Sequence, residues 1–402
     1  MVVPSRDVVP GPLGEFGPGF SAQLRSVGYA PRSIEGQLGL MRHLSRWLEA
    51  QGLTAVDLDD RTVDRFVAAR RREYVSFRSK RALMPLRAYL VSLGVTRGQG
   101  VEPKAPDEAL LEQFARYLST ERALAPETIR SYVSQVRPFV AAHMGDEGGW
   151  LSLTRRQVAA FVVDRAGRER PRSAQVRANA LRALLRWMWW ERMIASPLAD
   201  AVGSVAAPTG TALLKGLSAG EVSALFAQVF GDAPAHLRSG AMLSLMCRLG
   251  LRAGEVARLR LGDIDWRAGV ITVHGKRGRR DQMPLPVDVG RSLVTYLQRG
   301  RPPAGAYREV FLALDAPHRP IGRAAVTSVV SRALARAGIA GPGAAHRLRH
   351  TAACGVLAAG GGLVEAGQLL RHCSPAATQV YARSDLAALG ALARPWPIGG
   401  TR

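Results

Sequence analysis

Hydrophobic residues recur at helical spacing through the first half of the chain. The first helix that this pattern predicts carries apolar residues three or four positions apart, at Ile34, Leu38, Met41 and Leu44. Pro31 precedes them, and proline suits the first turn of a helix. Two more helical segments are predicted at 62–71 and 80–93. Residues 1–20 are rich in Pro and Gly without a period, so we predict a flexible lead-in there.

The same pattern returns at a constant offset of 95 residues. The matching pairs include Pro31 and Pro126, Ile34 and Ile129, Leu44 and Phe139, Leu58 and Leu153, Val63 and Val158, and Leu86 and Leu181. The second copy therefore predicts helices at 155–165 and 174–193. We predict two copies of one all-helical module, at 21–97 and 106–203, joined by a linker at 94–108. Repeats of this kind also occur in protein-binding scaffolds, so they do not name a function.

A break at 206–216 separates these modules from a half with different patterning. Helices are predicted over 218–258, where Ser218 and Glu221 have the spacing of a capping box. VITVH and DQMPL then alternate around the basic turn GKRGRR, which predicts a β-hairpin. The predicted fold class is mainly α with a small antiparallel β-hairpin or sheet. The boundaries of this half are placed at 212–394 for the domain and 395–402 for a tail.

Charge indicates the kind of partner. The 402 residues include 55 Lys+Arg against 32 Asp+Glu, a net charge of +23. Such an excess favours a polyanion, most often nucleic acid, although a basic surface without that function is the alternative. With 47% hydrophobic and 22% charged residues, the chain is an ordinary globular protein, which excludes disorder and collagen as its main structure. Only four of the cations are lysines.

Three widely spaced cysteines argue against a disulfide framework and for a reducing compartment. The N-terminus lacks a basic segment followed by an apolar run, so we expect no signal peptide. No stretch of about 18 apolar residues occurs, so we expect no membrane span. The sequence therefore predicts a cytoplasmic protein.

Separate segments of the second half carry residues suited to phosphodiester chemistry. Arg252 and Arg349 can both fork onto one phosphate. Lys276, in the predicted hairpin turn, can donate a proton, which arginine cannot do near neutral pH. His346 and His372 are candidate acid, base or hydrogen-bonding groups.

Tyr381 follows His372 by nine residues and is a candidate nucleophile. His350 is the alternative to His346 as the base. No His, Asp and Glu spacing indicates a metal site, and no GxxxxGK[ST] motif indicates nucleotide-driven chemistry. We therefore expect no cofactor and a metal-free attack on a phosphodiester.

The ordered set GLRAGE, GKRGRR, HRLRH, LLRH and a final tyrosine resembles the tyrosine recombinase, or phage integrase, family. The resemblance covers 212–394 and the helical module before it. It implies a core-binding (SAM-like) module followed by a tyrosine-recombinase catalytic domain, and the sequence repeat adds a second core-binding-like module before them. It also implies a site-specific DNA recombinase that cleaves and rejoins strands through a covalent 3′-phosphotyrosyl intermediate, without metal or ATP.

The resemblance also implies residue roles. They are Tyr381 as nucleophile, Arg252 and Arg349 as the phosphate clamp, Lys276 as general acid, His346 as the group assisting Tyr381, His372 as a hydrogen-bond donor to the phosphate, and Glu255 as an acid supporting the arginine and histidine. Tyrosine has a pKa near 10, so its attack at neutral pH needs a base and a cationic pocket. Further DNA-binding candidates are Arg70, Arg165, Lys215, Arg277, Arg279 and Arg280.

Two features depart from the family pattern. Arg371 stands where LLGH has glycine, and we expect it to add a phosphate contact or shift the loop. The helical module is doubled, which is similar to recombinases of bacterial mobile elements and implies a nucleoid-associated bacterial protein. We expect the first copy to extend the DNA footprint; contact with a neighbouring protomer is the alternative.

The expected partners are double-stranded DNA and further copies of the chain, as a dimer on each site and a tetramer in the synapse, with sister recombinases as additional partners. A helical segment after the nucleophile, at Leu386, Leu389 and Leu392, is expected to dock on the neighbouring protomer. The rival functions are a non-cleaving DNA-binding accessory protein of the same fold and a type IB topoisomerase.

Overall fold

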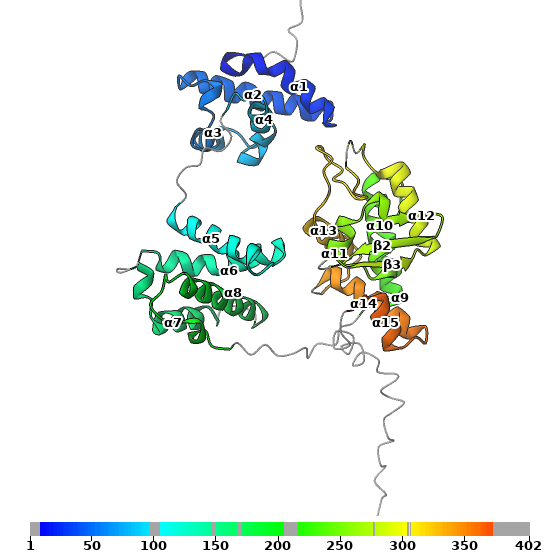
Figure 1. Ribbon diagram of the computed structural model, residues 1–402. Helices are drawn as coiled ribbons and strands as arrows, with labels where there is room; N and C mark the ends of the chain where they lie inside the picture. The colour runs from blue at the N-terminus through cyan, green and yellow to red at the C-terminus, as the bar shows by residue number, and fades with distance from the viewer. Residues whose placement is uncertain are drawn as a thin grey trace, which may run out of the picture. The chain divides into compact units, whose positions relative to one another are not determined.

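The computed structural model describes most of the chain (Figure 1). The described residues are 9–96, 105–145, 149–166, 171–204, 216–275, 278–303, 305, 307–341 and 343–372. They form a mainly helical protein with one small antiparallel sheet, which confirms the predicted fold class. No helix within these residues is long and apolar enough to cross a membrane.

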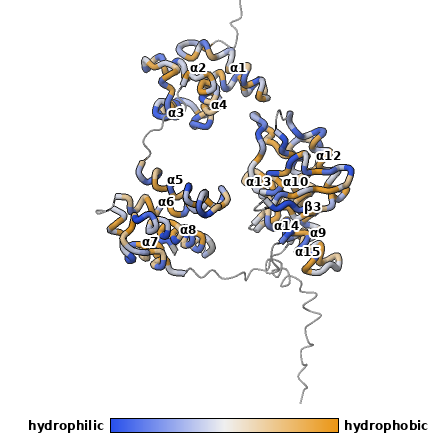
Figure 2. The backbone as a smooth tube through the Cα atoms, in the orientation of Figure 1, coloured by the Kyte–Doolittle hydropathy of each residue, from blue (hydrophilic) through white to orange (hydrophobic). Residues whose placement is uncertain are grey.

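The first module is built on a long central helix. Its elements are η1 (Gly11–Phe16), α1 (Gly17–Ser26), α2 (Pro31–Ala50), η2 (Ala55–Asp57), α3 (Asp60–Glu73) and α4 (Lys80–Ser92). Pro31 occupies the first turn of α2, as its rigid φ favours. Met41 and Leu44 of α2 are fully buried, which is the face that the helical spacing predicted. The tube in Figure 2 alternates between orange and blue along these helices because each buries one face.

The prediction of a flexible lead-in is wrong for the described part of 1–20. Residues 9–20 form η1 and the first turn of α1, and Leu13 and Phe20 are fully buried. The Leu13 N–H donates to the Ser45 hydroxyl at 3.0 Å, so the segment is also tied to α2 by a hydrogen bond. Proline and glycine start and turn these short helices, and the few apolar residues between them are enough to bind the segment to the core. Residues 1–8 lie outside the described part.

The second module repeats this plan. Its elements are α5 (Pro106–Thr120), α6 (Pro126–His143), η3 (Gly149–Ser152), α7 (Arg155–Ala166), α8 (Pro171–Trp190) and η4 (Ala199–Ala201). The starts of α6 and α7 follow those of α2 and α3 by the same 95 residues that the sequence repeat predicted. Helix α5 begins inside the predicted linker, at Pro106. The hydrophobic core of the second module is separate from that of the first module and includes Phe114, Phe139 and Leu184.

The remaining described residues surround helix α10. The elements are α9 (Ala219–Ala227), α10 (Pro234–Leu249), α11 (Ala253–Arg258), η5 (Leu261–Asp263), β1 (Ile264–Asp265), β2 (Val270–His274), β3 (Arg280–Pro284), α12 (Val287–Thr295), η7 (Tyr296–Gly300), α13 (Arg323–Arg336), α14 (Ala344–Ala358) and α15 (Leu363–Leu369). Residues 241–243 of α10 are fully buried, and α12, α13 and α14 pack against this helix.

The predicted capping box and hairpin are both present. Ser218 and Glu221 exchange hydrogen bonds with each other's backbone N–H groups at the start of α9. Strands β2 and β3 pair antiparallel, with Val270 opposite Pro284 and His274 opposite Arg280. The two-residue strand β1, which the sequence did not predict, completes a sheet in the order β1-β2-β3.

Candidate active site

A sharp turn between α10 and α11 brings the first candidate arginine to the surface. Gly250 ends α10 in the left-handed conformation, at φ +60°, which glycine adopts without strain. A Cβ atom there would also lie 2.6 Å from a methyl carbon of Leu370, so a larger residue would be strained and would displace the Leu370 side chain. Arg252 follows as the residue that caps α11, and its side chain is 40% exposed.

Glu255 holds Arg252 from the first turn of α11. One carboxylate oxygen, Oε1, accepts from Arg252 Nη1 at 2.7 Å, and Oε2 accepts from the Arg252 backbone N–H at 2.8 Å. The carboxylate is almost fully buried. Burial raises its pKa, but Arg371 and the hydrogen bonds from Arg252 outweigh burial and hold the pKa of Glu255 below its ordinary value. Glu255 therefore stays ionised at neutral pH.

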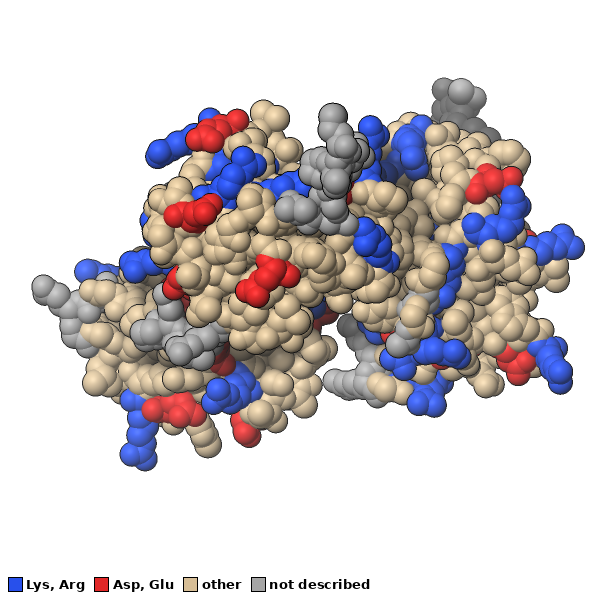
Figure 3. Space-filling view, turned by 90° about the horizontal axis from the view of Figure 1, so that it is seen from above, with Lys and Arg blue, Asp and Glu red and all other residues tan. Residues whose placement is uncertain are grey.

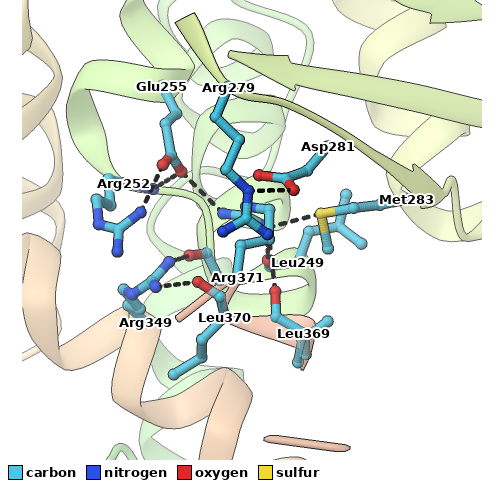
Figure 4. Close-up of polar contacts among 11 residues, drawn as sticks. Leu249, Arg252, Glu255, Arg279, Asp281, Met283, Arg349, Leu369, Leu370 and Arg371 are labelled. Carbon is cyan, nitrogen blue, oxygen red and sulfur yellow. Dashed lines mark hydrogen bonds and ion pairs between the residues drawn. The ribbon is translucent and has the colours of Figure 1, made fainter. Parts of the chain in front are cut away.

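Arg349 lies buried on α14, between the ends of two other helices. Its guanidinium donates from Nη1 to the Gly250 carbonyl and from Nη2 to the Leu370 carbonyl. The contacts join α14 to the end of α10 and to the end of α15 (Figure 4). The guanidinium is thus aligned by two backbone carbonyls, one two residues before Arg252 and the other directly before Arg371.

Two histidines beside these arginines have strongly lowered pKa values. Burial, His346 and Arg349 lower the pKa of His350 to about 4. Burial, Arg349 and Arg252 lower the pKa of His372 to about 4. Both imidazoles are therefore neutral at pH 7. His346 is exposed on α14, and its ring lies 5.7 Å from that of the buried His350, so His346 is the more accessible of the two candidates for the base.

Arg371 corrects the expectation of a phosphate contact. It lies one residue beyond the cap of α15 with its side chain turned inward, and Nη2 donates to Glu255 Oε2 at 2.8 Å. Nη1 contacts the Leu369 carbonyl at 3.1 Å and the sulfur of Met283 (Figure 4). Arg371 is only 7% exposed, so it is a buried partner of the acid. No spacing in the sequence indicates this contact, because 116 residues separate the two side chains.

The remaining candidates do not join this cluster within the described residues. Lys215, Lys276, Arg277 and Tyr381 lie outside the described part. Arg279 and Arg280 are exposed beside the hairpin turn, and Arg279 Nε donates to Asp281 at 2.8 Å. Arg165 is half-buried on α7, with its guanidinium 5.6 Å from the ring centre of Phe161.

Arg70 differs from the exposed DNA contact that its basic neighbours suggested. It is 6% exposed, and Nε donates to the carbonyls of Ser76 and Phe77 at 3.3 and 3.2 Å. Its guanidinium also lies 4.3 Å from the centre of the Tyr74 ring. Helical periodicity places Arg70 on the buried face with Val63 and Phe66, and the turn after α3 offers carbonyls to its charge. The exposed cations of this run are Arg71 and Arg72.

Three segments thus converge in the second half of the chain: the start of α11, the middle of α14 and the end of α15. Together they supply the cations Arg252, Arg349 and Arg371, the carboxylate of Glu255 and the imidazole of His372. Among the described residues, no group of three or more His, Cys, Asp or Glu side chains is arranged to hold a metal ion. An anionic group is the ligand that suits such a net positive, hydrogen-bond-donating cluster.

Known families match the second module and the catalytic half. Residues 215–387 match the phage integrase family, and residues 111–192 match the N-terminal SAM-like domain of phage integrases. An integrase/recombinase-type protein of Sinorhizobium fredii, y4rA, is 35% identical over 392 residues, which is 96% of this chain and 95% of that protein. The chain belongs to the phage integrase family.

Other relatives of this integrase are similar over about two thirds of its length or more. Tyrosine recombinase XerC of Yersinia pestis is 30% identical over 68% of this chain and 90% of its own length. Tyrosine recombinase XerD of Mycobacterium tuberculosis is 30% identical over 71% and 95%. These matches confirm the predicted enzyme class, a site-specific recombinase that breaks and rejoins DNA strands.

Solved structures confirm the fold of the integrase. XerH recombinase bound to palindromic difH substrate superposes with a TM-score of 0.56 at 16% identity, covering 82% of this chain and 93% of that one. A lambda integrase dimer bound to a COC′ core site superposes with a TM-score of 0.54 at 17% identity, covering 73% and 99%.

Proposed function

We propose that this integrase cleaves DNA by attack of the Tyr381 hydroxyl on a scissile phosphodiester. The observation that carries the proposal is the convergence of Arg252, Arg349 and His372 from three separate segments, with the buried carboxylate of Glu255 holding Arg252. Such a cluster favours a phosphate whose negative charge grows in the transition state. The family membership supplies the reaction class, and the ordered motifs supply the tyrosine.

The chemistry assigns each proton in turn. The tyrosine oxygen bonds to phosphorus, and His346 accepts the phenolic proton. Lys276 protonates the departing 5′-oxygen, which leaves a 3′-phosphotyrosyl link and a 5′-hydroxyl. Arg252 and Arg349 stabilise the non-bridging oxygens, and neutral His372 donates a hydrogen bond to them. Reversal, with a 5′-hydroxyl as the attacking group, rejoins the strands without ATP because the phosphotyrosyl link retains the energy of the broken bond.

The binding surface for DNA is distributed over the chain. Lys and Arg side chains are spread over the face seen in Figure 3, with Asp and Glu among them. In this proposal the second module and the catalytic half bind the recombination site through arginine–phosphate contacts, with Arg165, Lys215, Arg277, Arg279 and Arg280 as contributors. The affinity then falls steeply with salt concentration.

The first module extends this footprint in the same proposal. Its helices α2 and α3 begin 95 residues before α6 and α7 of the second module. Exposed cations lie from the end of α3 to the start of α4: Arg71, Arg72, Arg78, Lys80 and Arg81. Removal of residues 1–97 is expected to shorten the protected DNA segment without moving the cleavage position. An unchanged footprint would favour the alternative, contact with a neighbouring protomer.

The proposed assembly is a dimer on each site and a tetramer in the synapse, acting in the bacterial cytoplasm. Neighbouring structures support it, since they include a lambda integrase dimer on a core site and a lambda integrase tetramer on a Holliday junction. Sister recombinases are further partners to test. Deletion of 386–402 is expected to abolish recombination while leaving DNA binding intact; strand exchange by the truncated chain would contradict docking through this segment.

The decisive experiment begins by recovering DNA covalently trapped by the protein and sequencing it. A nicked suicide duplex with the recovered sequence is then incubated with the protein and with Tyr381→Phe. A covalent complex that the variant does not form supports the proposal, and no complex on any DNA favours a non-cleaving accessory protein. Joined products from two duplexes indicate recombination, whereas relaxation of one supercoiled duplex indicates a topoisomerase.

A further inference from the structure

Arg371 occupies a backbone position that normally belongs to glycine. Helix α15 closes with a Schellman pair of hydrogen bonds: the Arg371 N–H donates to the Gln368 carbonyl at 2.9 Å and the His372 N–H donates to the Gly367 carbonyl at 3.0 Å. Arg371 therefore has a left-handed φ of +54°. A residue with a Cβ is strained there, so a buried arginine at this position requires compensating contacts.

Those contacts all lie around the Arg252 site. Nη2 of Arg371 donates to Glu255 Oε2 at 2.8 Å, and the two side chains are 4% and 3% exposed. Nη1 contacts the Leu249 carbonyl at 3.4 Å, at the end of α10. The guanidinium thus links the end of α15 to the turn between α10 and α11 (Figure 4).

We infer that Arg371 is a positioning residue for DNA cleavage, which acts through Glu255 to hold the Arg252 guanidinium in place. The two carboxylate oxygens of Glu255 have different partners. Oε1 holds Arg252 Nη1, and Oε2 is shared by the Arg252 backbone N–H and Arg371 Nη2. Without Arg371, the buried oxygen Oε2 keeps one partner, and the carboxylate loses the more effective of the two positive charges that oppose its protonation. The inference rests on the proposed role of Arg252 in clamping the phosphate.

The charged groups around Glu255 also support a positioning role for Arg371. Arg252 on α11 and Arg371 beyond α15 face Glu255 directly. On the β3 side, Asp281 acts on Arg371 and is itself paired with Arg279. On the other side, Arg349 lies near His372. Among the groups that lower the pKa of Glu255, Arg371 has the largest effect. Loss of Arg371 therefore raises the pKa of Glu255, and a protonated Glu255 holds Arg252 less firmly at low pH.

The test compares Arg371→Gly, Arg371→Asn, Arg371→Lys, Glu255→Gln and the double variant Arg371→Gly/Glu255→Gln. Glycine and asparagine both accept the left-handed backbone, so the neutral variants relieve strain when they remove the charge. Single-turnover cleavage of the nicked suicide duplex is measured between pH 5.5 and 8.5, beside the Kd for the same DNA. Thermal unfolding verifies that each variant is folded.

We expect Arg371→Gly and Arg371→Asn to cleave about tenfold to a hundredfold more slowly at pH 6, with a smaller deficit at pH 8.5. The Kd stays within about twofold, because the arginine does not reach the surface. Arg371→Lys restores most of the rate, since it keeps the charge. The double variant cleaves no more slowly than Glu255→Gln, because both changes break the same chain of contacts.

Three results would overturn the inference: a cleavage rate unaffected in both neutral variants, additive effects in the double variant, or a weaker Kd with a reduced salt slope. The last would assign Arg371 a direct phosphate contact. Failure of the proposed function is a different result, since the wild-type protein would then form no covalent complex.

Discussion

Two buried arginines, Arg70 in the first module and Arg349 in the catalytic half, make similar hydrogen bonds to the backbone but have different side chains around them. Each is less than a tenth exposed, and each donates to two backbone carbonyls. Arg70 adds the face of the Tyr74 ring and fastens the turn after α3. Arg349 adds charged and imidazole groups from other segments, among them Arg252 and His372.

The difference shows what separates the proposed catalytic arginine from a structural one. Burial and carbonyl partners are common to both residues and indicate only that the charge is compensated. The convergence of further cations, an ionised acid and neutral histidines distinguishes Arg349. The four predictions below test this distinction, from the largest expected effect to the smallest.

The largest effect is expected for Arg349→Lys. Lysine keeps the charge but loses the planar fork that donates to the Gly250 and Leu370 carbonyls and suits bidentate contact with a phosphate. Single-turnover cleavage of the suicide duplex should fall about 100- to 1000-fold, an amount typical of losing one transition-state donor. Arg70→Lys is the control and should cleave at the wild-type rate once bound to DNA. A rate for Arg349→Lys within about threefold of wild type would contradict the assigned role.

The next effect is expected in the stability of the first module. Arg70→Met leaves the carbonyls of Ser76 and Phe77 without their donor and should lower the free energy of unfolding by about 1–3 kcal/mol in urea melts. Arg71→Met, at the exposed neighbouring position, should change it by less than about 0.5 kcal/mol. Equal effects of the two substitutions would show that the buried contacts of Arg70 do not stabilise the turn.

A smaller effect concerns pH. The pKa values of His350 and His372 are about 4 in the folded protein, against 6.5 for an exposed histidine. Between pH 6.5 and 4 the unfolded chain therefore binds more protons, and the free energy of unfolding falls as the pH falls. His350 is buried and His372 is partly exposed, so each contributes on the order of 1 kcal/mol, with the smaller contribution from His372 because solvent screens it.

Melting temperatures of the protein and its His→Gln variants across this range measure the effect. His350→Gln and His372→Gln should each flatten the pH dependence. His43→Gln, in the first module, should flatten it less, since the pKa of His43 is lowered by burial and by Arg70 to a smaller extent. An identical pH dependence in all four proteins would contradict the neutral state assigned to the two catalytic-half imidazoles.

The smallest effect is expected at the exposed cations of α3. Arg71→Gln and Arg72→Gln should each reduce the slope of log affinity against log salt by about 1 and weaken binding equally on specific and unrelated duplexes. Arg61→Gln, exposed at the opposite end of the same helix, should leave the slope unchanged. If all three variants had the salt slope of the wild-type protein, this end of α3 would lie away from DNA.

Local patterns in the sequence predicted much of the fold. Apolar spacing located the face of α2, reciprocal side-chain chemistry located the cap of α9, and alternation around a basic turn located β2 and β3. Each of these signals depends on residues close together in the chain. The lead-in was mistaken for a flexible segment because Leu13 and Phe20 are too few to form a pattern, although α2 offers them a complete core.

The site divides in the same way. The sequence by itself determined the family and the reaction class, because motif order carries that information. It also predicted the roles proposed for Arg252, Arg349, His346 and His372 from their residue types and motifs. Only the tertiary structure decided that Arg70 is buried, that Arg371 lies on Glu255 and that His350 and His372 are neutral. These properties depend on desolvation and on charges brought together from distant segments. Neither can be inferred from a local stretch of the sequence.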